Sequence, residues 1–99
     1  MSYNHMAELL SWKPAQRFGL ASKGDIAPGY DADIAIVDPL EKFVVRSSES
    51  ESVQGYSPFE GVELKGRVKS TFLRGSLIYD NGNVIGPASG RYLRRPLLA

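Results

Sequence analysis

Residues 23–37 read Lys-Gly-Asp-Ile-Ala-Pro-Gly-Tyr-Asp-Ala-Asp-Ile-Ala-Ile-Val, a turn-rich stretch that leads directly into an apolar run. Gly24, Pro28 and Gly29 break regular structure, because glycine adopts backbone angles that other residues avoid and proline fixes its own. Residues 33–37 then alternate with apolar side chains on both faces, which is typical of a strand covered on both sides. This stretch therefore predicts a sharp chain reversal followed by a buried strand.

The residues after this strand predict a small antiparallel sheet. Asp38-Pro39 should end the first strand, and a short second strand is expected at residues 43–46. Residues 67–74 alternate again, and Asn81-Gly82 is typical of a two-residue hairpin turn, because both residues tolerate positive φ.

The residues before the turn predict two short helices. Apolar residues recur at helical spacing from Met6 to Leu10, which favours a helix at about residues 6–11. Pro14 suits the first turn of a new helix at about residues 14–18, because its missing N–H needs no partner there. Gly19 stands where a left-handed residue would end that helix.

The chain divides into three parts on this reading. Residues 1–5 differ in character from the rest of the chain and are interpreted as a cloning remnant. Residues 6–20 form the helical segment. Residues 21–99 form the β portion, and its tail from residue 87 is expected to be irregular because it carries Gly90 and Pro96. Strands outweigh helices, so the fold class is mainly β with short N-terminal helices.

Composition excludes several functional classes. The 99 residues include no cysteine, which excludes disulfide scaffolds and cysteine-based zinc sites. The net charge of +1 provides no basic field for nucleic acid. No apolar run approaches the roughly 18 residues that span a bilayer, so no membrane contact is expected. A cytoplasmic location is compatible with these features.

No group of side chains meets the requirements of a catalytic centre. A catalytic zinc needs three or more protein ligands, and the chain has one histidine, His5, which lies in the segment interpreted as a cloning remnant. Two carboxylate pairs are conceivable acid–base groups, Asp31 with Asp33 and Glu60 with Glu63. Aspartates at the start of a strand are more often turn formers or caps of backbone N–H groups. We therefore assign no catalytic, cofactor-binding or metal-binding residue in this chain.

Three motifs resemble the amidohydrolase superfamily. Residues 13–20, Lys-Pro-Ala-Gln-Arg-Phe-Gly-Leu, resemble its Asn-Pro-Ala-x-x-Phe-Gly-Leu helix, although Lys13 replaces the asparagine that can cap the helix. Residues 23–33 are similar to its Lys-Gly-x-Ile-x-x-Gly-x-x-Ala-Asp signature. Residues 56–61, Tyr-Ser-Pro-Phe-Glu-Gly, resemble the C-terminal region of allantoinases and dihydroorotases and narrow the choice to the cyclic-amide branch.

The resemblance implies a place within a larger hydrolase. Such enzymes carry zinc or another divalent metal in a (β/α)8 barrel, whose ligands lie at the ends of barrel strands. This chain would be the C-terminal part of the small β-sandwich beside that barrel, inactive alone and without a cofactor of its own. No family catalytic position maps onto it. Its partners would be the barrel and the N-terminal half of the sandwich, and unpaired strand edges favour a homo-oligomer.

The resemblance also implies roles for individual side chains. Helical residues would pack on that barrel, namely Leu9, Leu10, Ala15, Phe18 and Leu20. Strand residues would fill the core of the sandwich, namely Ile34, Ile36, Val68, Phe72, Leu77 and Tyr79. The loop with Tyr56, Pro58 and Phe59 would fasten near the seam between barrel and sandwich. The resemblance does not specify which ring the larger hydrolase opens. The candidate substrates are allantoin, dihydroorotate, hydantoins and dihydropyrimidines, so the enzyme could serve either purine or pyrimidine metabolism. The alternative is an assembly module from a relative that has lost its metal ligands.

Overall fold

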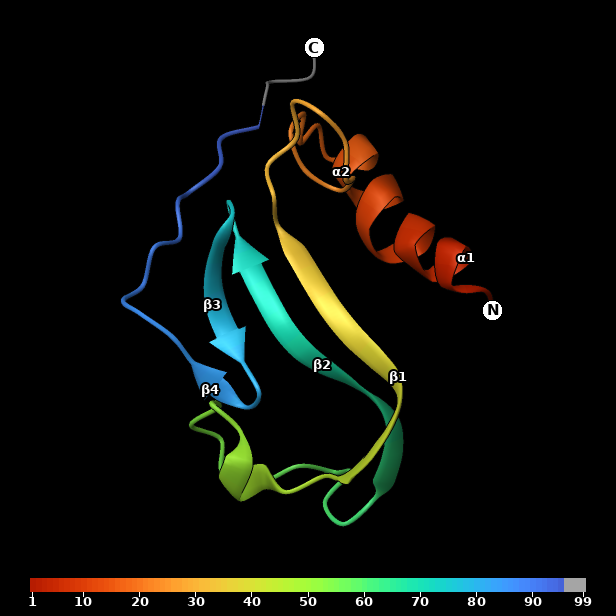
Figure 1. Cartoon of the computed structure of the whole chain (residues 1–99), viewed down its shortest axis with the longest axis vertical. Helices are drawn as coiled ribbons and strands as arrows, with labels where there is room; N and C mark the ends of the chain where they lie inside the picture. Colours follow the sequence, from red (N-terminus) through yellow and green to blue (C-terminus); the bar gives the residue numbers. More distant parts are fainter. Residues whose placement is uncertain (96–99) are drawn as a thin grey trace.

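The computed structural model describes residues 1–95 as a helical segment followed by one antiparallel sheet (Figure 1). The helical segment comprises α1 (Tyr3–Ala7), the π-helix η1 (Glu8–Trp12) and α2 (Lys13–Arg17). The sheet has the strand order β1 (Ile34–Val44), β2 (Glu63–Leu73), β3 (Ser76–Asp80) and β4 (Asn83–Val84), and a short 3-10 helix, η2 (Ser47–Glu49), follows β1. The prediction of a mainly β chain with N-terminal helices is confirmed.

The prediction of two helices separated before Pro14 is wrong, because the helical conformation is continuous from Tyr3 to Arg17. The N–H of Lys13 donates to the carbonyl of Glu8, five residues earlier. This π-type turn is wider than an α-helical turn, so the chain passes Pro14 without ending the helix. Gly19 follows with φ of 72°, which confirms the predicted left-handed stop.

The helix begins earlier than predicted, inside the segment interpreted as a cloning remnant. The Ser2 hydroxyl oxygen accepts the His5 N–H at 3.1 Å and so caps the helix. A serine at this position satisfies one of the four N–H groups that have no partner within the helix. The origin of residues 1–5, and the division of the chain into three parts, stay predictions.

Strand β1 is longer than predicted, because Asp38-Pro39 does not end it. The register between β1 and β2 shifts between Asp38 and Lys42, so Pro39 lies in a bulge. The Asp38 carboxylate accepts the N–H of Leu40 at 2.9 Å within this bulge. Because β1 is an edge strand, the missing N–H of proline costs no bond to a second neighbour.

Two irregularities interrupt the alternation of the strands that carry the predicted core residues. Lys69 is an extra residue of β2, since Ile36 pairs with Ser70 but Val37 pairs with Val68. Ile78 is likewise an extra residue of β3 opposite β2. Directly paired residues of an antiparallel ladder share a face, so the six predicted core residues do not all lie on one side.

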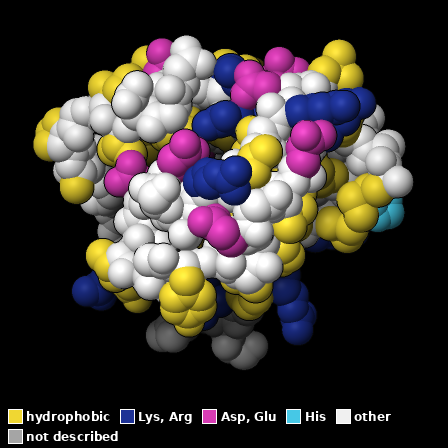
Figure 2. Space-filling model, turned by 90° about the horizontal axis from the view of Figure 1, so that it is seen from below, with side chains coloured by type: hydrophobic (Ala, Val, Ile, Leu, Met, Phe, Trp, Pro, Cys, Tyr) yellow, Lys and Arg dark blue, Asp and Glu magenta, His cyan; other side chains and the backbone are white. Residues whose placement is uncertain are grey.

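The sheet has no closed core within residues 1–95. Ala15, in α2, is the one apolar residue there that is buried, with 3% of its surface exposed. Predicted core residues such as Ile36 and Leu77 remain exposed by 49% and 38%. Hydrophobic side chains are accordingly visible across the surface in Figure 2. A single sheet leaves its faces uncovered, and a second sheet would be needed to bury them. That second half of a sandwich stays a prediction.

The two hairpins of the sheet turn through residue pairs with positive φ. Asn81 and Gly82, with φ of 45° and 88°, connect β3 to β4, which confirms the predicted turn. Arg74 and Gly75, with φ of 46° and 82°, connect β2 to β3 in the same way. Residues 86–95 then form no regular structure and return beside the sheet toward the helical segment (Figure 1). Among the helices of residues 1–95, none combines the length and the apolar character needed to cross a bilayer.

Candidate functional site

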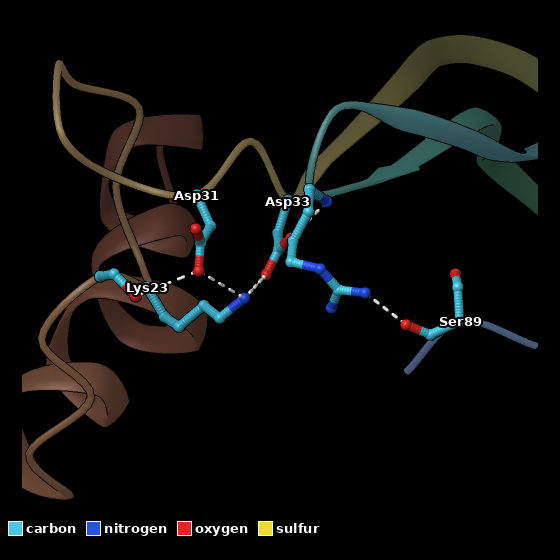
Figure 3. Close-up of polar contacts among 6 residues, drawn as sticks. Lys23, Asp31, Asp33 and Ser89 are labelled. Carbon is cyan, nitrogen blue, oxygen red and sulfur yellow. Dashed lines mark hydrogen bonds and ion pairs between the residues drawn. The ribbon is translucent and has the colours of Figure 1, made fainter. Parts of the chain in front are cut away.

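The most densely connected polar group is the Lys23 cluster, which we define as Ser22, Lys23, Asp31, Asp33 and Arg74 (Figure 3). The Lys23 ammonium lies 3.0 Å from Oδ2 of Asp31 and 2.5 Å from Oδ2 of Asp33. The Ser22 hydroxyl donates to Oδ2 of Asp31 at 3.1 Å. The structure therefore brings together the carboxylate pair that the sequence singled out, with a lysine between its two members.

Asp33 connects this turn to the sheet. Its Oδ2 atom faces Lys23, and its Oδ1 atom accepts the backbone N–H of Arg74 at 2.9 Å. The N–H of Gly75 also donates to the carbonyl of Ala32 at 3.0 Å. One carboxylate thus fixes the start of β1 against the β2–β3 hairpin, 41 residues later in the chain.

Arg74 extends the same network to the C-terminal tail. Its guanidinium donates to the carbonyl oxygen of Ser89, as Figure 3 shows. Its backbone adopts φ of 46°, which is unfavourable for a residue that carries a Cβ atom. Sequence reasoning missed this role of Arg74, and its only signal was the Arg74-Gly75 pair between two apolar runs.

The charges of the Lys23 cluster stabilise one another. Hydrogen bonding to Asp33 raises the pKa of Lys23 above its ordinary value of 10.5. Hydrogen bonding to Lys23, and secondly to Ser22, lowers the pKa of Asp31 below 3.8. The Lys23 hydrogen bond is also the largest cause that lowers the pKa of Asp33, and the Arg74 N–H acts in the same direction. At neutral pH all three groups are charged, so neither carboxylate carries a proton to donate as a general acid, and the lowered pKa values make both weak bases.

We expect the stability of this turn to depend on pH at both extremes. Because the pKa values of Asp31 and Asp33 are lowered by folding, their contribution is present above 3.8 and is lost as the pH falls through the folded-state values. The pKa of Lys23 is raised, so its contribution is lost only as the pH rises beyond 10.5. The protection factor of the Arg74 amide in hydrogen exchange should be flat between these limits and should fall below about pH 4. An equally steep acid response in an Asp33→Asn variant would contradict this assignment.

Gly24 places the cluster directly against the helical segment. A Cβ atom at Gly24 would lie 2.6 Å from Cβ of Ala15 and 2.6 Å from the carbonyl oxygen of Ser11. Gly24 also adopts φ of 90°, a conformation that favours glycine. The backbone of the turn therefore packs directly on the Ser11 carbonyl and on Ala15, the one buried apolar side chain among residues 1–95, which explains a glycine directly after Lys23.

The other candidate residues are not brought together. Glu60 accepts the N–H of Ser47 at 2.9 Å, whereas Glu63 starts β2 opposite Val44. His5 lies exposed in α1. Residues 1–95 contain no group of three or more His, Cys, Asp or Glu side chains that could hold a metal ion. The donors present therefore do not fit a catalytic metal, and no chemical step is assigned to one in this chain.

The loop after β1 borders a cavity of about 320 Å³. Its lining includes Arg46, Ser47 and Tyr56 and the residues that follow up to Phe59. Tyr56 and Phe59 themselves are exposed by 69% and 61%. These aromatic side chains have little contact with the rest of residues 1–95, so their predicted role at a seam stays a prediction.

Comparison with known proteins identifies the family of this chain. Residues 1–78 match the profile described as the amidohydrolase family. The chain belongs to the amidohydrolase family. An allantoinase of Rubrobacter xylanophilus is 43% identical over 89 residues, which cover 90% of this chain and 20% of that protein. A D-hydantoinase of Ralstonia pickettii is 38% identical, over 96% of this chain and 21% of its own length. The predicted resemblance to cyclic-amide hydrolases is therefore confirmed.

Solved structures of amidohydrolases contain the same fold. A D-hydantoinase superposes with a TM-score of 0.89 and 39% identity, over 96% of this chain and 21% of that chain. An L-hydantoinase of Arthrobacter aurescens superposes with a TM-score of 0.83 and 33% identity, over 87% of this chain and 19% of that chain. The amidohydrolase chain described here thus spans about one fifth of the length of the relatives it matches.

Proposed function

We propose that this amidohydrolase chain is a structural portion of a metal-dependent hydrolase that opens the C–N bond of a cyclic amide. The observation that carries the proposal is the 43% identity to an allantoinase over 90% of this chain, which equals only 20% of that enzyme. The donor set of residues 1–95 does not fit a metal site, so the catalytic groups belong to the rest of such an enzyme. The rival assignment, an assembly module without metal ligands, gains no support from relatives named as hydrolases.

The exposed apolar surface supports partners of the kind predicted from the sequence. Leu9, Leu10 and Phe18 remain exposed by 46%, 71% and 52% in or directly after the helical segment. Both faces of the sheet also carry exposed apolar side chains, among them Ile36 and Val37. Complete burial of a fully exposed side chain of this kind contributes about 1.5–3 kcal/mol, so covering these half-exposed side chains contributes roughly half as much for each. We propose that a barrel covers the helical segment and that a second half-sandwich covers the sheet.

The role of the chain can be tested by transplantation. We expect that this chain, substituted for the matching fifth of the Rubrobacter allantoinase, yields a folded enzyme that still hydrolyses allantoin. The kcat/KM should stay within about tenfold of the parent enzyme, because no transition-state contact is removed. A matched chimera with the Ralstonia D-hydantoinase should retain the substrate of that host. A folded, metal-loaded chimera without activity, or one that changes substrate, would overturn the structural role.

The isolated chain gives a second test of the same proposal. With added zinc it should hydrolyse allantoin, dihydroorotate and hydantoin no faster than zinc alone, because at least three converging ligands are required. Ring opening above the metal blank, measured by loss of ultraviolet absorbance or by chromatography, would contradict the proposal. The cytoplasmic location stays a prediction.

A further inference from the structure

Two stretches of chain connect the helical segment with the sheet. Among residues 1–95 no helix packs directly on a strand, and Figure 1 shows the helical segment beside the sheet rather than across it. The first connection is the turn at residues 18–33, which carries most of the Lys23 cluster. The second is the tail at residues 86–95, which leaves the sheet after β4 and returns to the helical segment. Within this chain, the placement of the two parts therefore depends on what holds these stretches.

Two side-chain contacts anchor the tail, one toward each end. The Arg74 guanidinium donates to the carbonyl oxygen of Ser89, as Figure 3 shows. The Arg95 guanidinium lies over the ring of Phe18, directly after α2, with 5.4 Å between the guanidinium carbon and the ring centroid. The first anchor belongs to the β2–β3 hairpin and the second to the end of the helical segment, so the tail joins the two parts.

Few other contacts hold the tail in the part of the chain that the structure describes. Among residues 1–95, no backbone N–H of the tail donates a hydrogen bond to a backbone carbonyl. The first half of the tail borders a cavity of about 480 Å³ beside β2 and β3, and its second half borders one of about 260 Å³ beside the turn that follows α2. A segment without regular hydrogen bonds depends on its specific anchors for its position.

The backbone of Arg74 indicates that its side chain has a role. Arg74-Gly75 has φ of 46° and 82°, and Asn81-Gly82 has nearly the same φ values, 45° and 88°. Asparagine tolerates this left-handed conformation, whereas arginine has no such preference and its Cβ atom makes the conformation costly. Residues strained in this way persist where their surroundings or their function fix them. The hydrogen bond to Ser89 accounts for an arginine at a position where asparagine would fit the turn.

We propose that the tail is a strap that locks the helical segment against the sheet, and that Arg74 fastens it. Arg74 acts here as a positioning residue for both connections. Its side chain holds the tail at Ser89, and its N–H donates to Asp33 at the end of the turn. The proposal concerns contacts inside this chain, so it requires no free surface and is independent of the proposed hydrolase function.

Release of the tail can be measured by trypsin cleavage after Arg91, which lies between the two anchors. The test uses the full-length protein that carries this chain, and mass spectrometry follows the cleavage. An Arg74→Asn variant should be cleaved there at least about fivefold faster than the wild type, because loss of a charged hydrogen bond raises the open population. Its melting temperature should not fall, since asparagine relieves the left-handed strain. Arg67→Gln is the matched control, because Arg67 contacts Glu41 and Phe43 and should leave this cleavage at the wild-type rate.

A second measurement tests the lock itself. The N–H of Asp31 donates to the carbonyl of Ser22 at 2.9 Å, within the turn that forms the other connection. Its protection factor in hydrogen exchange should fall in Arg74→Asn and in Arg95→Gln, because the turn then connects the two parts alone. Three results would each overturn the strap: unchanged cleavage in Arg74→Asn, faster cleavage with a lower melting temperature, or faster cleavage with unchanged exchange at Asp31. The first would mean that other contacts hold the tail, the second that the protein is destabilised throughout, and the third that the tail locks nothing.

Discussion

Replacing Gly24 by alanine is expected to separate the helical segment from the turn that precedes β1. The new Cβ atom would lie 2.6 Å from both the Cβ atom of Ala15 and the carbonyl oxygen of Ser11. Neither neighbour is a flexible side-chain end, so relief requires movement of the helix backbone. Overpacking of this kind costs about 1–3 kcal/mol, and the left-handed backbone at φ of 90° adds about 1 kcal/mol. The free energy of unfolding in urea should fall by the sum of these two costs.

Gly29 offers a matched control for this substitution. It adopts φ of 88°, close to that of Gly24, but a Cβ atom there would have no neighbour within 4 Å. Gly29→Ala should therefore cost only the conformational part, about 1 kcal/mol. Exchange of the Leu20 amide, which donates to the carbonyl of Ala15, reports the local effect. Equal losses for the two variants would show that the close contact with the helix is unimportant.

Replacing Asp33 by alanine is expected to disconnect the start of β1 from the β2–β3 hairpin. The change removes the acceptor of both the Lys23 ammonium and the Arg74 N–H. Hydrogen bonds to charged groups contribute about 1.5–3 kcal/mol each in favourable settings. The Asp33 side chain remains 32% exposed, so water compensates part of this loss. We expect a net cost of about 1–2 kcal/mol in urea unfolding.

Two further variants assign that cost to the cluster. Asp25 accepts only the N–H of the next residue, Ile26, so Asp25→Ala should change stability by less than about 0.5 kcal/mol. Lys23→Met combined with Asp33→Ala should cost less than the two single changes added together, because the singles remove the same ion pair. Additive effects would mean that Lys23 and Asp33 act independently.

The family and the turns could be predicted from the sequence because both depend on local residue types. The stretch at residues 23–33 contains the Gly24 and Gly29 positions that reverse the chain. Asn81-Gly82 likewise predicted its hairpin, since the φ values of such a turn exclude most other residues.

Only the tertiary structure decided how the predicted pieces fit together. The extra residues Lys69 and Ile78 shift the register, and no local pattern marks them, because a bulge depends on the partner strand. Pro39 does not end β1, because β1 occupies the edge of the sheet.

The Lys23 cluster shows the same limit of local patterns. Lys23, Asp33 and Arg74 are visible in the sequence as separate charges. They become one network only because the fold brings a hairpin 41 residues later in the chain against the start of β1. Local backbone preferences therefore determined the turns of this chain, whereas strand position and long-range charge pairing determined its register and its polar network.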